Sequence, residues 1–186
     1  MSSVTTQAYP YDQRKGYPWA YTFTLSYIAG SLMDNKFLPY DPGILPWKAS
    51  PSPGDKLILE LPGVPPRKAT NRSIRNKRHP HHSAFLALRS AAILAMDGRA
   101  WTFGPVKMDL TVFSPNPIGH FELNDYFGGI MDTLDGSSGT TFTFLPIVFE
   151  DDCQLASGDT NWALAKDCHY KLKITFLPEL PQTQND

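Results

Sequence analysis

Alternation of apolar and polar residues marks the clearest predicted strand of the chain, at residues 106–113. The apolar positions in it are Val106, Met108, Leu110 and Val112. Because successive side chains of a strand point to opposite faces of a sheet, this pattern predicts a half-buried strand. Two β-rich runs, at residues 56–61 and 169–176, predict further strands, and so does the apolar run at 146–149.

Two other segments have apolar residues at the spacing of a helix. The first begins after Ser83, a good N-cap residue, and ends at the turn formed by residues 97–98. The second covers residues 125–134, with Asn124 as its predicted cap. The order β–α–β–α–β–β predicts an α+β two-layer domain, in which a mixed sheet of about four strands packs with two helices.

The first 54 residues differ in composition from the rest of the chain, because they combine several prolines with many aromatic residues. Disordered segments are poor in aromatic residues, so we expect this N-terminal extension to pack against the domain or a partner chain, with stacking on unpaired bases as the alternative. Residues 20–28 alternate loosely and could form a strand. We therefore predict an extension at 1–54, a domain at 55–180 and a polar tail at 181–186.

Length and cysteine content limit the class of protein. The chain has 186 residues, about the size of one domain, and no apolar run approaches the roughly 20 residues of a membrane span. Its N-terminus lacks the basic and apolar regions of a secretory signal. The two cysteines cannot form a disulfide framework or a zinc site. We therefore expect a cytoplasmic protein without a membrane partner.

Charges are separated along the chain. The net charge of −1 argues against a surface built throughout for nucleic acid, yet six of the twelve residues at 67–78 are basic and residues 108–165 contain no Lys or Arg. Two interpretations stay open: the basic and acidic blocks pair with each other, or a phosphate-binding strip lies beside a carboxylate site for a divalent cation. The candidate DNA-binding residues are Arg67, Lys68, Arg72, Arg75, Lys77 and Arg78.

Two carboxylate groups lie beside predicted strands. Residues 122–125 (Glu-Leu-Asn-Asp) open the second predicted helix, and residues 150–155 (Glu-Asp-Asp-Cys-Gln-Leu) follow the strand predicted at 146–149. Carboxylates at neighbouring strand ends can meet around one or two divalent ions, which polarise a phosphodiester and generate a hydroxide nucleophile. Acidic pairs are also common in turns, so a structural role for Asp151 and Asp152 stays open.

The order of these motifs over residues 55–177 resembles that of the RusA family of Holliday junction resolvases. The matching segments are a strand with a proline-rich turn at 57–66, Asn71-Arg72, Glu122-Leu-Asn-Asp125, Ile130-Met-Asp-Thr-Leu134 and Asp151-Asp-Cys-Gln154. The resemblance implies a homodimer that hydrolyses four-way DNA junctions with Mg²⁺. It also implies a catalytic role for Glu122, Asp125 and Asp152, with Mg²⁺ bound by these three residues and Asp151.

The chain departs from the family's pattern in several places: Glu122 stands at the first catalytic aspartate, Asp125 falls on the family's asparagine, and the segment between Asp135 and Glu150 is longer than in the family. Two further departures bear most on activity. Asn124 stands where the family has its second catalytic aspartate, and Gly128 stands where it has a lysine. These departures favour an alternative, a RusA-like protein that has lost turnover and binds nucleic acid or serves as a structural subunit. A structural subunit whose N-terminal extension swaps between protomers is a third interpretation.

Two smaller features each have two interpretations. His79, His81 and His82 could bind a transition metal, or they could belong to a loop that faces phosphate. Gly128 and Gly129 fall within a predicted helix, where they allow either close packing of the helix or room for a DNA backbone.

Overall fold

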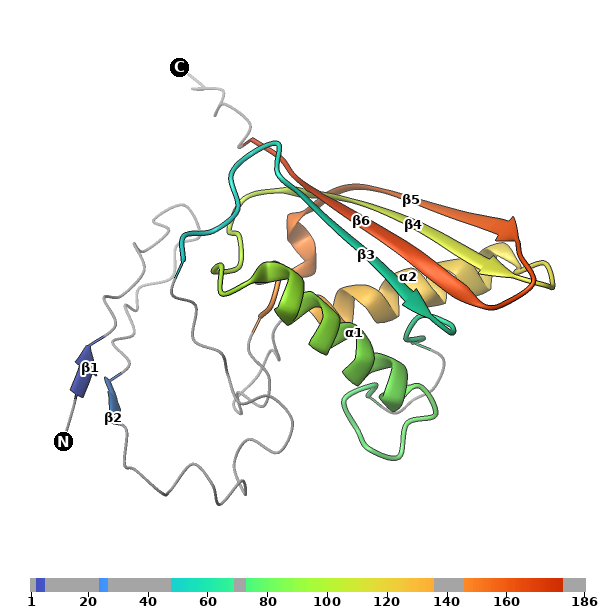
Figure 1. Cartoon of the computed structure of the whole chain (residues 1–186), viewed down its shortest axis with the longest axis horizontal. Helices are drawn as coiled ribbons and strands as arrows, with labels where there is room; N and C mark the ends of the chain where they lie inside the picture. Colours follow the sequence, from blue (N-terminus) through green and yellow to red (C-terminus); the bar gives the residue numbers. More distant parts are fainter. Residues whose placement is uncertain (1–2, 6–23, 27–47, 69–72, 136–145, 179–186) are drawn as a thin grey trace. The chain divides into compact units, whose positions relative to one another are not determined.

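The computed structural model describes residues 3–5, 24–26, 48–68, 73–135 and 146–178 (Figure 1). The chain divides into two compact units, residues 1–39 and 40–186. In the first unit, β1 (Ser3–Thr5) pairs antiparallel with β2 (Thr24–Ser26), which falls within the strand predicted at 20–28. The rest of the predicted extension up to residue 47 lies outside the described residues, as does the predicted tail.

Four strands of the second unit form a mixed sheet in the order β3-β6-β4-β5 (Figure 1). β3 (Lys56–Pro62) and β4 (Val106–Ser114) both run antiparallel to β6 (His169–Phe176), which lies between them. β5 (Leu155–Leu164) pairs parallel to β4 and forms one edge of the sheet. This arrangement confirms the α+β fold class with four sheet strands and two helices.

One face of the sheet and the two helices share an apolar core. The predicted alternation at 106–113 is confirmed, because β4 alternates buried and half-buried positions along its length. Helices α1 (His82–Met96) and α2 (His120–Leu134) lie on the same side of the sheet in Figure 1 and contribute to this core. Each has 15 residues, and among the described residues no helix is long and apolar enough to span a membrane.

Helix α1 begins slightly before the predicted one and ends where predicted. It starts at His82 with His81 in the N-cap position, so Ser83 lies in the first turn and does not cap the helix. At the other end, Asp97 adopts the left-handed conformation with φ 48°, and Gly98 follows with φ 75°. A left-handed residue after the last helical position is a common way to end a helix, so residues 97–98 stop α1 as expected.

Helix α2 begins more than a turn earlier than predicted. Gly119 occupies the N-cap position, and the Leu123 N–H donates to the Gly119 carbonyl at 3.0 Å. The prediction that Asn124 caps this helix is therefore wrong, since Asn124 lies inside it. Leu123 explains the earlier start, because this buried side chain extends the apolar stripe of α2 toward its N-terminus.

The strand predicted at residues 146–149 is wrong. Ile147 and Val148 are buried, but their N–H groups donate to the Leu134 carbonyl, and only Phe149 forms an isolated bridge, to Thr102. The strand that follows, β5, is one that we did not predict. As a result, the acidic segment at 150–155 leads into a strand rather than following one.

Candidate functional site

Helix α2 carries four carboxylates along one side. Glu122 and Asp125 lie in its first two turns, Asp132 lies near its end, and Asp135 is the C-cap residue. At 100° per residue, these positions fall within about 140° of one another around the helix axis. The rise of 1.5 Å per residue puts about 15 Å between Glu122 and Asp132 along the axis, so the carboxylates form two separate pairs.

The first pair is bound to a single arginine. Arg67 donates from NH1 to Glu122 at 3.2 Å, and from Nε and NH2 to Asp125 at 3.2 and 3.0 Å. The Tyr126 hydroxyl also donates to Glu122, at 2.9 Å, and the Arg67 guanidinium lies 5.8 Å from the Tyr126 ring centre. Burial, followed by the hydrogen bond to Glu122, raises the pKa of Tyr126 to about 12. Glu122 and Asp125 therefore share one arginine, whose single positive charge offsets one of their two negative charges.

Close packing against α2 brings this arginine into position. A Cβ atom added to Gly129 would lie 2.3 Å from the Pro66 carbonyl oxygen, so only glycine leaves room for the chain at residues 66–67. Next to it, the Lys68 N–H donates to the Asp125 carbonyl at 3.1 Å. A Cβ atom on Gly128 would meet only the Lys68 side chain, at 3.6 Å. Gly129 thus supports the close-packing interpretation of the glycine pair.

The second pair also has basic partners. Lys68 Nζ lies 3.2 Å from Asp132, and Arg75 NH2 donates to Asp135 at 2.7 Å and to the Asp132 carbonyl at 2.9 Å. Three of the candidate DNA-binding residues, including Arg67, therefore contact the acidic side of α2. In this respect the basic and acidic blocks pair with each other, as the first of the two charge interpretations expects.

Asp135 is a weaker acid than an ordinary aspartate in spite of its arginine. Burial raises its pKa to about 6, and the neighbouring charges of Asp132 and Asp152 raise it as well, whereas Arg75 and Arg89 lower it. Asp152, which is distant in sequence, therefore lies close enough to the C-terminal end of α2 for its charge to affect the pKa of Asp135. Three carboxylates at this end of the helix, Asp132, Asp135 and Asp152, therefore lie near three basic side chains, Lys68, Arg75 and Arg89, and burial is the main cause of the raised pKa.

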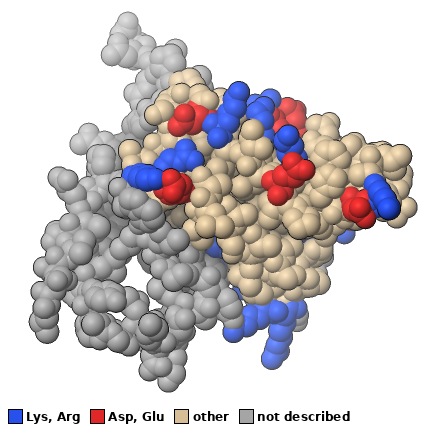
Figure 2. Space-filling view, in the orientation of Figure 1, with Lys and Arg blue, Asp and Glu red and all other residues tan. Residues whose placement is uncertain are grey.

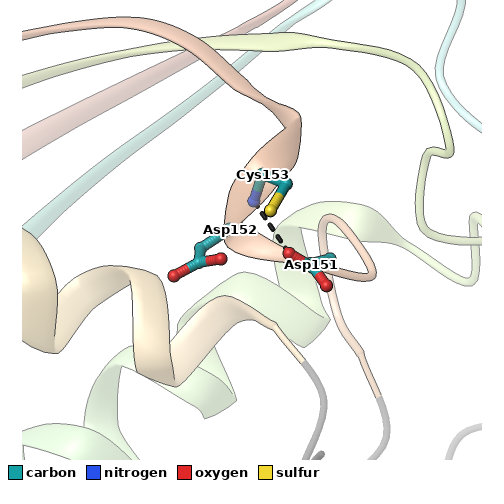
Figure 3. A group of neighbouring side chains, drawn as sticks. All are labelled: Asp151, Asp152 and Cys153. Carbon is teal, nitrogen blue, oxygen red and sulfur yellow. Dashed lines mark hydrogen bonds between the residues drawn. The ribbon is translucent and has the colours of Figure 1, made fainter.

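Asp151 and Asp152 are adjacent but have different environments. Asp151 caps a single 3-10 turn, η3 (Asp152–Gln154), and its side chain accepts a hydrogen bond from the Cys153 N–H at 2.8 Å. Figure 3 shows the Asp152 carboxylate directed away from Asp151 and toward α2. Asp151 therefore shapes the turn, while Asp152 projects from it.

The predicted metal ligands are divided between the two ends of α2. Among the described residues, the ligand atoms of Asp151, Asp152 and Cys153 lie within 4.8 Å of one another, and all three residues are exposed (Figure 3). Glu122 and Asp125 do not join this group and are bound to Arg67 instead. The hydrogen bond and negative charge of Asp151 raise the pKa of the Cys153 thiol, so its protonated form is favoured and it is a poor metal ligand.

Two residues at this end of α2 were not among our predicted ligands. Asp132 and Asp135 are three positions apart, a spacing that puts side chains on neighbouring parts of a helix surface. That spacing was visible in the sequence. The proximity of Asp152 to Asp135 was not, because it depends on where η3 lies relative to α2.

The remaining candidate DNA-binding residues lie around the start of α1. Lys77 and Arg78 are exposed in the loop that precedes this helix. In Figure 2, basic side chains are visible along the lower edge of the described surface, where this loop lies. Arg72 lies outside the described residues. The loop is therefore an exposed part of the basic block, as Lys68 is.

The histidines of this loop serve its structure. His79 and His82 are buried; His79 Nδ1 accepts from the His81 N–H at 3.1 Å, and His82 Nδ1 lies 3.1 Å from the Ile74 carbonyl. Burial lowers the pKa of His81, and the nearby charges of His79 and Arg67 lower it further. Among the described residues, no candidate metal group includes these histidines.

Comparison with known proteins identifies no relative: no family model matches this sequence, and no curated protein matches it. The resemblance to the RusA family therefore depends on its motifs and their spacing. In the motif at residues 151–154, Asp152 projects toward the end of α2, and Asp151 and Gln154 form the capping box of the turn.

Proposed function

We propose that this protein is a Mg²⁺-dependent endonuclease that cleaves four-way DNA junctions, as the resemblance to the RusA family implies. The observation that carries this proposal is the direction of Asp152, which projects from η3 toward the carboxylates at the C-terminal end of α2 (Figure 3). These carboxylates come from distant parts of the sequence, and Asp152 lies near enough to Asp135 for its charge to raise the pKa of that carboxyl. Among the described residues, Asp132 and Asp135 do not join the group of ligand atoms that Asp151, Asp152 and Cys153 form within 4.8 Å.

The donor set at this end of α2 fits a hard divalent cation. Mg²⁺ takes oxygen ligands, retains several waters and needs only one or two protein carboxylates. Asp152 would hold the ion, and Asp132, Asp135 and Asp151 would add negative charge around it. Burial is the main cause of the raised pKa of Asp135, and the charges of Asp132 and Asp152, which a bound cation would offset, raise it as well. When bound, Mg²⁺ supplies Lewis-acid activation of the phosphodiester and of the attacking water.

Basic side chains would bind the DNA around the reacting phosphate. Lys68 is exposed and lies beside Asp132, so it can contact a phosphate next to the carboxylate cluster. Lys77 and Arg78 would bind phosphates farther along the strand, and binding would then weaken as the salt concentration rises. A homodimer would match the two-fold symmetry of a four-way junction. The free, exposed cysteines Cys153 and Cys168 fit the reducing environment of the cytoplasm.

The second candidate is a protein that binds branched DNA without cleaving it. It is favoured by the pairing of Glu122 and Asp125 with Arg67, because this pairing occupies two carboxylates that the family resemblance assigns to catalysis. In that case DNA binding would depend on the basic loop alone and would not need a divalent ion.

One experiment separates these candidates. The protein is incubated with a labelled four-way junction and with a linear duplex of the same sequence, each in Mg²⁺ and in EDTA. The proposal expects cleavage of the junction in Mg²⁺, with little cleavage of the duplex and none in EDTA. Tight binding to the junction without cleavage in either buffer would favour the second candidate.

A further inference from the structure

We infer that Gln154 is a positioning residue, which fixes the turn from which Asp152 reaches toward α2. This inference rests on the proposed function for the role of Asp152. Gln154 is a polar side chain with an exposed fraction of only 9%, immediately before β5. A buried amide is costly unless its donors and acceptor are all engaged, so its partners indicate what it holds together.

The oxygen of this amide holds the acidic segment. Gln154 Oε1 accepts from the Glu150 N–H at 2.8 Å and from the Asp151 N–H at 3.0 Å. Together with the Asp151 side chain, which accepts from the Cys153 N–H, this forms a reciprocal capping box around η3. Asp152 lies between the two capping residues, so both of them set the path of its backbone.

The nitrogen of the same amide ties this turn to the sheet. Gln154 Nε2 donates to the Thr102 carbonyl at 2.9 Å and to the Gly104 carbonyl at 2.9 Å. These carbonyls belong to the segment that leads directly into β4, the strand between β5 and β6. The two partners of Oε1 are N–H donors and the two partners of Nε2 are carbonyl acceptors. The partners therefore fix which end of the amide is oxygen and which is nitrogen.

The four hydrogen bonds explain why so short a turn can position a side chain. Three residues in a 3-10 turn have little stability of their own, because such turns make few and poorly aligned hydrogen bonds. Gln154 joins η3 to the start of β4, and the Val148 carbonyl accepts from the Thr102 N–H at 2.9 Å in the same region. Gln154 therefore ties the backbone from which Asp152 projects to the segment that leads into β4.

The test compares two variants of Gln154 with a control at the opposite end of β4. Gln154→Ala removes all four hydrogen bonds, whereas Gln154→Glu keeps an acceptor for Glu150 and Asp151 but loses the donation to the two carbonyls. The control is Ser114→Ala, because Ser114 is also buried and accepts from Trp162 Nε1 at 2.8 Å. Each variant is measured for thermal stability, for junction affinity in EDTA and for cleavage over a range of Mg²⁺ concentrations.

We expect Gln154→Ala to raise the Mg²⁺ concentration for half-maximal cleavage by about tenfold or more, the usual effect of losing a residue that orients a metal ligand. Gln154→Glu puts an oxygen in place of the donating nitrogen, facing the Thr102 and Gly104 carbonyls, so it gives an increase at least as large, and it decides the outcome if Gln154→Ala does not fold. Junction affinity in EDTA stays at the wild-type value. Ser114→Ala lowers the melting temperature without changing the Mg²⁺ dependence. An unchanged Mg²⁺ dependence in the folded Gln154 variants, or an equal change in Ser114→Ala, overturns the inference.

Failure of the proposed function gives a different result from failure of this inference. If the wild-type protein does not cleave the junction, the proposed function is overturned, and Mn²⁺ binding to the same variants is measured by electron paramagnetic resonance. Weaker Mn²⁺ binding by both Gln154→Ala and Asp152→Asn then supports the positioning role. Equal binding by the wild type and the variants, or no binding by the wild type, overturns it.

Discussion

Gly129 of α2 packs directly against the backbone of Pro66, so closely that a Cβ atom on the glycine would lie 2.3 Å from the Pro66 carbonyl oxygen. This contact lays the next two residues, Arg67 and Lys68, along the acidic side of the helix. Arg67 then pairs with both Glu122 and Asp125, and Lys68 pairs with Asp132. A backbone contact without charged groups therefore brings both basic side chains to the carboxylates of α2.

The two glycines of α2 are expected to respond to alanine in opposite directions. Gly129→Ala forces the Pro66 backbone away and should lower the free energy of unfolding by about 1–3 kcal/mol, as overpacking does. Gly128→Ala meets only the flexible Lys68 side chain and should raise it by up to about 1 kcal/mol through better helix propensity. Urea denaturation of both variants measures these changes. A Gly129→Ala variant as stable as Gly128→Ala would show that the close approach is not required.

Asp135 should make stability depend on pH. Its folded-state pKa of about 6 is above the ordinary value of 3.8, so its stabilising contribution is complete below pH 3.8 and is lost as the pH rises through 6. Asp135→Asn represents the neutral form and should lack this loss, which amounts to up to about 3 kcal/mol for a shift of this size. The free energy of unfolding is measured for both proteins between pH 4 and 8, in EDTA. Parallel pH profiles would contradict the raised pKa.

Salt dependence of DNA binding should distinguish the two parts of the basic block. Each phosphate contact that is lost lowers the slope of log affinity against log salt concentration by about 0.9 on duplex DNA. Lys77→Ala and Arg78→Ala should each reduce the slope by about this amount, because both side chains are exposed in the loop before α1. Arg67→Ala should change it less, since its guanidinium is bound to Glu122 and Asp125. An equal change for all three variants would contradict this division.

The cap of η3 should contribute to stability through hydrogen bonding rather than charge. Asp151→Ala removes the acceptor for the Cys153 N–H and should lower the free energy of unfolding by about 0.5–2 kcal/mol. Asp151→Asn keeps an acceptor oxygen and should lose much less. Thermal denaturation of the two variants provides the comparison, and equal losses would indicate that the charge matters instead.

Most of the sheet could be predicted because β3, β4 and β6 alternate in burial along their length. β5 could not, because an edge strand paired to β4 buries few side chains and its sequence shows no alternation. Gly158 within it lies against Phe127, where a Cβ atom would come within 2.3 Å of the ring. The apolar run at 146–149 led to the prediction of a strand because its side chains are apolar. Residues 147–149 are buried without forming a strand, and a short apolar run in the sequence does not distinguish a strand from another buried segment.

The separation of charge along the chain was visible in the sequence, but its consequences were not. The partners of Arg67 and Arg75 depend on how the segment after Pro66 crosses α2, which is a tertiary contact. The different roles of Asp151 and Asp152 depend likewise on the capping box of η3, which residue types alone do not specify.

The most direct test of the proposed function compares two neighbouring substitutions in the cleavage of a four-way junction in Mg²⁺. Asp152→Asn should lower the cleavage rate by about a hundredfold or more. Mutation of residues that only hydrogen-bond to a metal ligand already lowers metal affinity or activity by about 10–100-fold, and a ligand itself should matter more. Asp151→Asn, which still caps η3, should stay within about tenfold of the wild type. Cleavage by Asp152→Asn at the wild-type rate, or equal loss in both variants, would contradict a nuclease site built on Asp152.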